Sequence, residues 1–490
     1  MNIIKKPLQP KQIPDFVSFI SYLQEFKQNP ALCDDNRTLT YEEFCSQVLR
    51  KVKFIQSLNL PAQTNIAILS ENSIEVVELF LAIPASGNIV ITLPSTLDKT
   101  QLAVMIEKFD IKAIFTDKNE QLQLQEKKLL VFSCMESSED EATLTPIAPD
   151  TPAVIFLTGG TTGELKGALH THSSVLFAAF LSLYLYHDHY GALDGFAYKR
   201  VLLSLPLFHV MGMTDCILFT LYSGSFVYVC PDVKNSLAKI PSFKPERLIL
   251  VPGMVEILLN LAETNKEYLS SVTFIITGAA PMNNDYAARA EKLGIKLALG
   301  YALSETSGAL IVNFNCDVIP HASGPIIGQL KCKFVNNELW IKCPNLMLGY
   351  YKDPELNAKS FEDGWFKTGD LAKLEEYKGR QYLVITGRKK NLIILSNGEN
   401  VSPEELDRLL LQHKEVKDCQ VKVMTVNGNE VIGAEIIPDS EVEGKEVFDK
   451  IIEDINKNLP SFKQIRTYKI RRLEFEKSYA MKKVIKRTTL

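Results

Sequence analysis

A stretch rich in glycine and threonine, from Leu157 to Gly167, constrains this chain more than any other. It reads LTGGTTGELKG, and the apolar run Ala153–Leu157 before it is typical of a buried strand. Glycine permits positive φ and close approach of the backbone to a ligand, so successive N–H groups can line a concave anion site. Threonine hydroxyls add donors, and Lys166 adds a mobile positive charge. The stretch therefore predicts a loop that binds a polyphosphate.

The loop is not of the Walker A type, in which Lys and then Ser or Thr directly follow the last glycine. Here Gly163 is followed by Glu164, and Lys166 is followed by Gly167. An ordinary glycine-rich turn after a strand is the alternative. The density of Thr, Gly and Lys in so short a stretch favours phosphate binding.

Composition indicates a globular protein with more than one domain. The chain has 490 residues and a formal net charge of -4, with no basic stripe that would suggest a nucleic acid partner. Its nine cysteines are scattered without a C-x-x-C pair, which predicts reduced thiols and a cytoplasmic protein. The N-terminal MNIIKKPLQPKQIPDF lacks the apolar core of a signal peptide. The most apolar region, Val201–Cys230, is interrupted by Pro206 and Asp215, which predicts buried strands and a helix and no transmembrane segment.

Residues 1 to about 150 alternate between strand and helix patterns. Thr40 is a candidate N-cap for a helix that begins at Tyr41. Strands are predicted at Asn65–Leu69, Ile89–Leu93 and Ala113–Thr116, and helices at Ile74–Ile83 and Leu102–Phe109. Such alternation predicts parallel sheets flanked by helices. Glycine turns and short strands between Gly324 and Pro354 predict a small barrel or distorted sheet, and the residues after Pro403 predict an α+β pattern.

Three later segments carry candidate polar site residues. His209, in LPLFHVMG, is either a satisfied core residue or a site residue. Glu305, in GYALSET, offers the hard oxygen ligand that Mg²⁺ prefers, and a surface glutamate is the alternative. Asp370, in GWFKTGD, can accept two hydrogen bonds from a ribose diol, and an ordinary turn aspartate is the alternative.

Four histidines follow the glycine-rich loop and could be read as metal ligands: His170, His172, His187 and His189. We expect a helix cap and exposed loop histidines there instead. The apolar run Val175–Tyr186 predicts a helix.

Taken together, these segments closely resemble the adenylate-forming superfamily, which includes acyl-CoA synthetases, aryl-CoA ligases, luciferases and peptide-synthetase adenylation domains. The usual phosphate loop there is Thr-Ser-Gly-Thr-Thr-Gly-x-Pro-Lys-Gly, and this chain has Gly159 for the Ser and Leu165 for the Pro. Six motifs occur in the superfamily's order over most of the chain.

The resemblance implies a role for each matching residue. The phosphate loop would comprise Thr158, Gly159, Gly160, Thr161, Thr162, Gly163 and Lys166. The nucleoside would be held by Gly278, Ala279 and Ala280 against adenine, Tyr301 stacked on it, Asp370 at the ribose, and Arg388 at ribose or phosphate. Ser304 would donate to the α-phosphate, Glu305 would hold Mg²⁺, and His209 would line the acyl pocket near the carboxylate. Apolar segments at Val210–Asp215 and Thr306–Leu310 would line the rest of that pocket.

The resemblance also implies an α/β fold of stacked layers with a β-rich subdomain and a small mobile α+β C-terminal domain. Residues 1–386 would bind ATP and the acid, and residues 387–490 would form a lid that turns about Lys390. The catalytic lysine of the lid would be Lys483, with Lys482 as the alternative. The enzyme would use ATP and Mg²⁺ to convert a fatty or aryl acid to acyl-AMP and would then transfer the acyl group to coenzyme A.

Two alternatives remain open. One is a ligase that loads an acyl carrier protein instead of free coenzyme A. The other is a catalytically impaired, nucleotide-binding relative, which is suggested by Asn397 and Lys482 where the superfamily has glycines.

Overall fold

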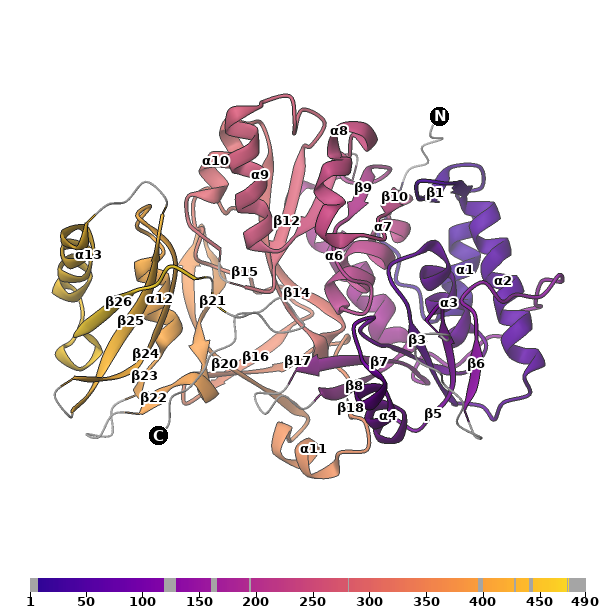
Figure 1. Ribbon diagram of the computed structural model, residues 1–490. Helices are drawn as coiled ribbons and strands as arrows, with labels where there is room; N and C mark the ends of the chain where they lie inside the picture. Colours follow the sequence, from indigo (N-terminus) through magenta and orange to yellow (C-terminus); the bar gives the residue numbers. More distant parts are fainter. Residues whose placement is uncertain are drawn as a thin grey trace.

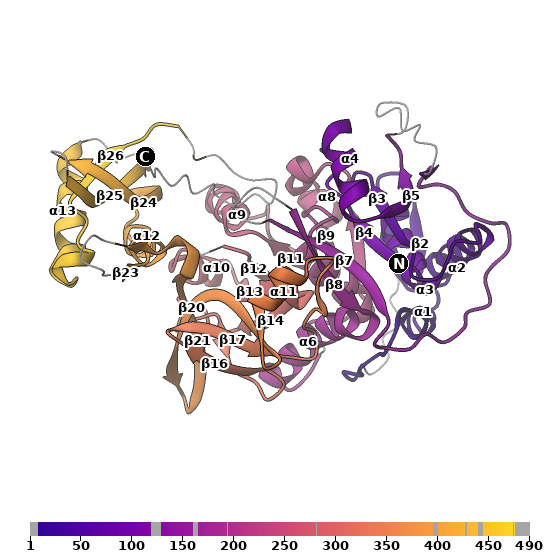
Figure 2. The same cartoon turned by 90° about the horizontal axis from the view of Figure 1, so that it is seen from below.

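The computed structural model describes residues 8–118, 129–159, 165–193, 195–280, 282–394, 400–426, 429–439, 444–473 and 475. Three sheets form the larger part of the molecule, and a smaller α+β part beyond residue 392 lies at one end (Figures 1 and 2). Helices cover the two larger sheets, and the third sheet is antiparallel. This architecture agrees with the predicted α/β class, its β-rich region and its small C-terminal α+β part.

The first large sheet carries the start of the predicted phosphate loop. Its order is β18 (Gly349–Tyr350), β8 (Leu165–Thr171), β7 (Pro152–Gly159), β4 (Ile89–Thr92), β3 (Asn65–Leu69), β5 (Ile111–Thr116) and β6 (Leu130–Phe132). The strands from β7 to β6 are parallel, while β8 is antiparallel to both β7 and β18. Both faces of β3 and β4 are buried, which explains why these strands read as continuous apolar runs.

The second large sheet is also mainly parallel. Its order is β14 (Gly308–Asn313), β13 (Lys296–Leu303), β12 (Phe274–Gly278), β11 (Arg247–Leu250), β9 (Arg200–Leu203), β10 (Phe226–Val229), β1 (Pro30–Cys33) and β2 (Thr38–Thr40). Only the outer pairs β13–β14 and β1–β2 are antiparallel among the described strands of this sheet. The carboxyl ends of its parallel strands therefore meet at one edge, where α/β proteins usually bind ligands.

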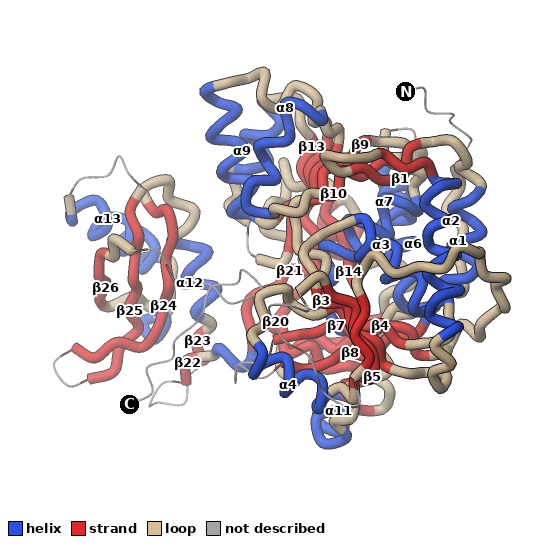
Figure 3. The backbone as a smooth tube through the Cα atoms, turned by 45° about the vertical axis from the view of Figure 1, so that its right-hand side comes forward, coloured by secondary structure: helices blue, strands red, loops and turns tan. Residues whose placement is uncertain are grey.

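Helices pack around and between these sheets, as Figure 3 shows in blue against the red strands. The helices of the large part are α1 (Phe16–Gln24), α2 (Tyr41–Ser57), α3 (Ile74–Ala85), α4 (Lys99–Lys108), α6 (His172–Tyr190), α7 (Phe219–Tyr222), α8 (Ile240–Phe243), α9 (Pro252–Thr264) and α10 (Tyr286–Lys292). Thr40 caps α2 as predicted, in a capping box with Glu43. Helix α6 contacts β7 and β8 of the first sheet and β14 of the second, so it joins the two layers.

The third sheet and the C-terminal part complete the fold. The third sheet has the order β15 (Gly324–Pro325), β21 (Arg380–Arg388), β20 (Trp365–Tyr377), β17 (Glu338–Lys342) and β16 (Lys331–Val335), with β19 (Phe361–Glu362) beside β20 and α11 (Pro354–Ser360) before it. The C-terminal elements are β22 (Ile393–Ile394), β23 (Asn400–Val401), α12 (Pro403–Leu410), β24 (Val416–Val426), β25 (Asn429–Pro438), α13 (Lys445–Lys457) and β26 (Thr467–Ile470). They enclose a hydrophobic core of their own, built around Leu406, Val421 and Phe448.

Two local expectations differ from the structure. His170 lies on β8 and His172 begins α6, and both are fully buried rather than exposed on a loop. The helix starts at this point because Thr171 forms a capping box with Ser174, which an apolar pattern alone does not reveal. The helix expected within Val201–Cys230 is partly a π-helix, η1 (Met211–Leu218), a rare form that is frequent at functional sites.

Candidate functional site

Three residues from different motifs meet at the edge of the second sheet. Asp370, on β20, is 2 % exposed and accepts a hydrogen bond from the Tyr301 hydroxyl at 2.6 Å through Oδ2. Its Oδ1 lies 2.7 Å from Nε of Arg388, its register partner on β21. Burial and the neighbouring Asp370 raise the pKa of Tyr301 well above 10, so this hydroxyl remains a donor. Tyr301, Asp370 and Arg388, which we call the carboxylate triad, were each predicted to contact the nucleotide, and the fold brings them together.

A second group links Glu305 to the phosphate-loop lysine. Glu305 lies in the short helix η3 (Ser304–Thr306), and its Oε1 accepts a 2.7 Å hydrogen bond from the Tyr350 hydroxyl. Lys166 Nζ lies 5.5 Å from the centroid of the Tyr350 ring. Tyr350 stands on β18, which pairs with the same β8 that carries Lys166. The tyrosine thus holds the predicted magnesium ligand and the predicted phosphate-binding lysine on one side of the fold.

Ser304 is held through its backbone. Its carbonyl accepts a 2.8 Å hydrogen bond from Nε2 of His170. Burial lowers the pKa of His170 to about 4, so this histidine is neutral near pH 7. His170 therefore acts as a fixed donor between β8 and η3, a positioning role that its sequence context did not reveal.

The predicted phosphate loop is described only at its two ends. Thr158 and Gly159 close β7 and pair with Lys166 and Leu165 across the hairpin. A Cβ on Gly159 would meet no atom within 4 Å, so the backbone faces open space there. The remaining predicted loop residues, Gly160, Thr161, Thr162 and Gly163, lie outside the described residues.

The predicted adenine-facing segment follows β12. Gly278 pairs with Gly300 of β13, and a Cβ on Gly278 would lie 2.8 Å from the Gly300 carbonyl oxygen. Only glycine permits this close approach. Ala279 has φ of +67°, a strained conformation that is typical of functional sites, and Ala280 is exposed beside it.

His209 lies in a loop that a buried asparagine holds in place. Asn72 Nδ2 donates to the Leu205 carbonyl at 2.9 Å, and Asn72 Oδ1 accepts from the backbone N–H of Leu207 at 2.9 Å. The His209 ring is half-buried and lies 4.3 Å from the Phe208 ring, centroid to centroid. Asn72 carried no signal in the sequence beyond its place before a helix cap, because its partners are more than a hundred residues away.

Gly212, the second residue of η1, brings this π-helix against the His209 loop. A Cβ at Gly212 would lie 2.2 Å from the Pro206 carbonyl oxygen, which no real contact allows. The LPLFHVMG segment therefore needs its glycine for close packing as well as its histidine for a site.

Glu338 is a further residue that the sequence did not single out. It is buried on β17; its Oε1 accepts from the backbone N–H of Gly369, and its Oε2 lies 2.8 Å from Lys389 Nζ. Glu338 thus braces the turn before Asp370 and the start of η4 (Lys389–Asn391), the segment that contains the predicted hinge residue Lys390. Asn397, Lys482 and Lys483 lie outside the described residues.

The residues present fit a magnesium ion that arrives with a nucleotide. Glu305 offers a single carboxylate that Tyr350 links to Lys166, and Mg²⁺ usually takes one or two protein carboxylates plus phosphate oxygens and water. Within the described ranges, no group of three or more His, Cys, Asp or Glu side chains is placed to hold a metal on its own. The same part of the chain contains no helix with the length and apolar character needed to cross a membrane.

Comparison with known proteins gives the family. The model of the AMP-binding enzyme family matches residues 21–351, and that of the AMP-binding enzyme C-terminal domain matches residues 390–490. The chain therefore belongs to the AMP-binding enzymes, the adenylate-forming superfamily predicted from its motifs. At the level of class, this confirms the prediction of an AMP-forming acid–thiol ligase.

Individual curated relatives share about 30% of their residues with this chain. The 2-succinylbenzoate–CoA ligase of Haemophilus influenzae is 28% identical over 386 residues, covering 78% of this chain and 77% of the relative. The long-chain-fatty-acid–CoA ligase of Bacillus subtilis is 30% identical over 309 residues, covering 59% and 53%.

Solved structures share the fold. The anthranilate CoA ligase AuaEII in complex with anthranoyl-AMP superposes with a TM-score of 0.83 at 18% identity, over 97% of each chain. The o-succinylbenzoate CoA synthetase of Bacillus subtilis, in complex with ATP and magnesium ion, gives 0.79 at 22% identity, over 96% of this chain and 98% of that one.

Proposed function

We propose that this protein activates a carboxylic acid, fatty or aryl, with ATP to acyl-AMP and pyrophosphate and then transfers the acyl group to coenzyme A. The observation that supports this proposal best is that Tyr301, Asp370 and Arg388, from three separate motifs, contact one another. Glu305, which Tyr350 links to Lys166, lies close enough to Arg388 to raise its pKa. The relatives named above, which are CoA ligases for succinylbenzoate and fatty acids, support the choice of acceptor.

Each group has a proposed task. The carboxylate triad binds the nucleoside, with Asp370 oriented towards the ribose by Tyr301 and Arg388. Ser304, Lys166 and the phosphate loop bind the phosphates, and Glu305 holds Mg²⁺, which when bound offsets the phosphate charge. His209 lines the acid pocket near the reacting carboxylate. Lys483 is the proposed catalytic lysine.

The proposed reaction has two balanced steps. A carboxylate oxygen of the acid attacks the α-phosphorus, the bond to the bridging oxygen breaks, and pyrophosphate leaves. Donors fixed before the reaction stabilise the charge that develops on the phosphates. A thiolate then attacks the acyl carbon, the anhydride bond breaks, and AMP leaves with both bonding electrons.

We further propose that residues 1–386 act as the nucleotide- and acid-binding domain and residues 387–490 as a lid. The separate hydrophobic core of the C-terminal elements supports this division. All nine cysteines are free thiols, which supports the proposal that the protein acts in the cytoplasm, where thiols stay reduced.

The test is pyrophosphate release from Mg·ATP over a panel of short, medium, long and aromatic acids, each with and without coenzyme A. We expect one acid class to stimulate release and acyl-CoA to form when coenzyme A is present. If release depends on the acid but no acyl-CoA forms, and a holo carrier protein becomes acylated instead, then the acceptor is the carrier protein and not coenzyme A. ATP binding without release for any acid would contradict the ligase activity.

A further inference from the structure

A buried polar cluster lies between η1 and β14, within the two segments that were expected to line the acid pocket with apolar side chains. Asp215 of η1 is 9 % exposed, and its Oδ1 accepts a hydrogen bond from the backbone N–H of Ala309 at 3.0 Å. No described residue forms an ion pair with it. Burial raises the pKa of Asp215 to about 7, although the Ala309 hydrogen bond acts in the opposite direction. A carboxylate in this setting is costly unless it receives further hydrogen bonds.

Two neighbouring hydroxyls strengthen the case for a missing partner. Thr214 and Ser307 are fully buried, and neither Thr214 Oγ1 nor Ser307 Oγ has a hydrogen-bond partner among the described residues. Buried polar atoms without partners are rare, since each costs about 1–3 kcal/mol. Thr214 is next to Asp215 in η1, and Ser307 is next to Gly308, which approaches Asp215 closely. A ligand that reaches these groups would supply the hydrogen bonds that they lack.

The cluster lies beside the proposed site. Gly308 and Ala309 pair with Leu303 and Ala302 in the β13–β14 hairpin that also carries Tyr301 and leads into Glu305. Helix η1 begins two residues after His209. A Cβ at Gly308 would lie 2.7 Å from Asp215 Oδ1 and 3.2 Å from Thr214 Cγ2, so glycine lets the hairpin approach the cluster closely.

We propose that Asp215, with Thr214 and Ser307, binds a hydrogen-bond donor, a hydroxyl or amino group, that the acid substrate carries away from its reacting carboxylate. This rests on the proposed acid-activating function and narrows its substrate class. A plain hydrocarbon tail or unsubstituted ring would leave both hydroxyls without a partner, and the Asp215 carboxylate with the Ala309 hydrogen bond alone among the described residues. Sites built around hydrogen-bonding groups reject analogues that lack the matching group far more strongly than apolar pockets reject a missing methylene. The apolar pocket expected from Val210–Asp215 and Thr306–Leu310 is therefore polar at this end.

A purely structural role for Asp215 makes a different prediction. The β13–β14 register shifts between Tyr301 and Ala302, and Asp215 could serve only to satisfy Ala309 at this irregularity. The substitution Asp215→Asn keeps an acceptor for Ala309 and nearly the same shape, but it removes the charge. A structural role would alter all acids alike, while the proposed role alters only acids that bear the donor.

The experiment measures calorimetric binding of matched acids to the full chain in the presence of a non-hydrolysable Mg·ATP analogue. The pairs are benzoate against its hydroxy and amino derivatives, and a fatty acid against its ω-hydroxy derivative. We expect at least one substituted acid to bind the wild type about tenfold or more tightly than its parent, and Asp215→Asn to reduce that ratio to about threefold or less. Glu78→Gln is the control, because Glu78 is also a buried carboxylate whose pKa is raised to about 7, but it lies on α3. The ratio of the affinities for the substituted and the parent acid should be the same in this variant as in the wild type.

Several results would overturn the proposal: no preference for any substituted acid in the wild type, or equal weakening of both members of each pair by Asp215→Asn. If Asp215→Asn does not fold, Thr214→Val replaces it and should weaken only the substituted acid, by about threefold. Pyrophosphate release is measured in parallel. If substituted acids bind selectively but no pyrophosphate is released, the proposed ligase activity is wrong and this inference stands. If pyrophosphate is released with all acids and substituted acids are not preferred, this inference is wrong and the ligase activity stands.

Discussion

Asp370 illustrates the residue scale, because one buried carboxylate orients two other site residues. Its two oxygens contact the Tyr301 hydroxyl and the Arg388 guanidinium. Burial acts to lower the pKa of Arg388, but the charge of Asp370 opposes it and the net shift is upward, so the arginine stays charged.

We expect Asp370→Asn to raise the KM for ATP by about 10- to 100-fold, since it removes a charge-assisted bond to Arg388 and an acceptor for the proposed ribose. Steady-state pyrophosphate release at varied ATP measures this. Tyr301→Phe, which removes only one hydrogen bond, is the matched comparison and should raise the KM for ATP by about tenfold or less. Equal ATP KM values for Asp370→Asn and the wild type would contradict the assignment of the ribose to this carboxylate.

His172 gives a prediction about pH. It is fully buried, its Nδ1 accepts from the backbone N–H of Phe16, and burial lowers its pKa to about 4. Below about pH 6.5, His172 is therefore protonated in the unfolded chain but stays neutral in the folded chain. The stability that neutral His172 contributes is lost as the pH falls from about 6.5 towards 4.

His172→Asn keeps an acceptor for Phe16 but cannot titrate. We expect it to be less stable than the wild type at pH 7.5, and the difference in unfolding free energy to shrink by about 2 kcal/mol at pH 5. Denaturant unfolding of both proteins at the two pH values measures this. The difference between the proteins isolates His172 from Glu78 and Asp215, whose raised pKa values act with the opposite sign in this range. A pH-independent difference would show that His172 is not buried in the neutral form.

At the scale of elements, the π-helix η1 depends on Gly212. Because a Cβ there would overlap the Pro206 carbonyl oxygen, Gly212→Ala must displace the loop that carries His209. We expect the KM for the acid to rise about tenfold or more with little change in the KM for ATP, measured by varying each substrate in turn. Gly253→Ala, in α9 where a Cβ meets no atom within 4 Å, is the control and should be neutral.

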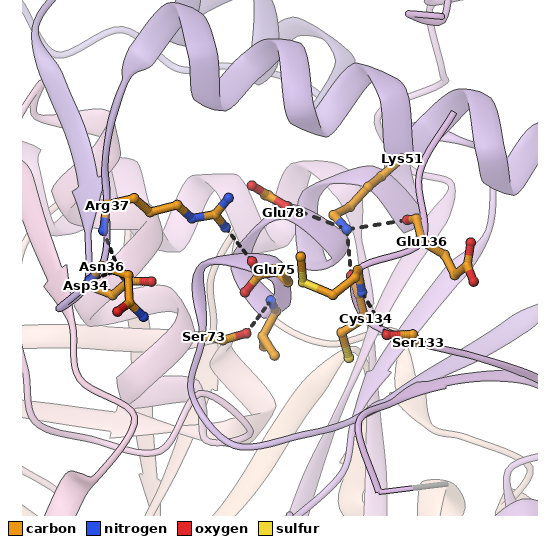
Figure 4. A network of polar contacts seen from close by, with 12 residues as sticks. Asp34, Asn36, Arg37, Lys51, Ser73, Glu75, Glu78, Ser133, Cys134 and Glu136 are labelled. Atoms are coloured by element: carbon orange, nitrogen blue, oxygen red, sulfur yellow. Dashed lines mark hydrogen bonds and ion pairs between the residues drawn. The ribbon is translucent and has the colours of Figure 1, made fainter. Parts of the chain in front are cut away.

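Helices α2 and α3 are joined to the chain beyond β6 by a buried lysine. Lys51 Nζ lies 3.6 Å from Glu78 Oε2 and donates to the carbonyls of Cys134 and Glu136 at 2.6 and 3.4 Å (Figure 4). We expect Lys51→Met to lower the unfolding free energy by about 3 kcal/mol near pH 8, because it leaves a buried carboxylate and two carbonyls without their donor. The loss should be smaller below pH 6, where Glu78 is protonated. Denaturant unfolding at both pH values checks this, and an unchanged midpoint would disprove it.

At the scale of the whole molecule, the proposed lid would contribute Lys483 to the first half-reaction and withdraw it before the second. Lys483→Ala should abolish pyrophosphate release, yet leave thioester formation from supplied acyl-AMP largely intact, because the lid supplies this lysine only for the first step. Lys482→Ala serves as the matched comparison and should retain both activities. The reverse pattern would move the catalytic role to Lys482.

The sequence by itself determined the class of the protein and most of its secondary structure. The alternating apolar runs became the buried parallel strands, Thr40 capped its helix, and the ordered motifs indicated the superfamily, because each of these signals is local in the chain. Asp370 and Tyr301 were likewise predicted as site residues, each from its own motif.

Only the tertiary structure decided which of these residues act together and what holds them. The contacts of Asp370 with Tyr301, of Asn72 with Leu205 and of His170 with Ser304 join segments 69, 133 and 134 residues apart. The unusual π-helix and the burial of Asp215 likewise depend on packing against β14. Hydrogen bonding and desolvation act through space, so a pattern read along the chain could not reveal them.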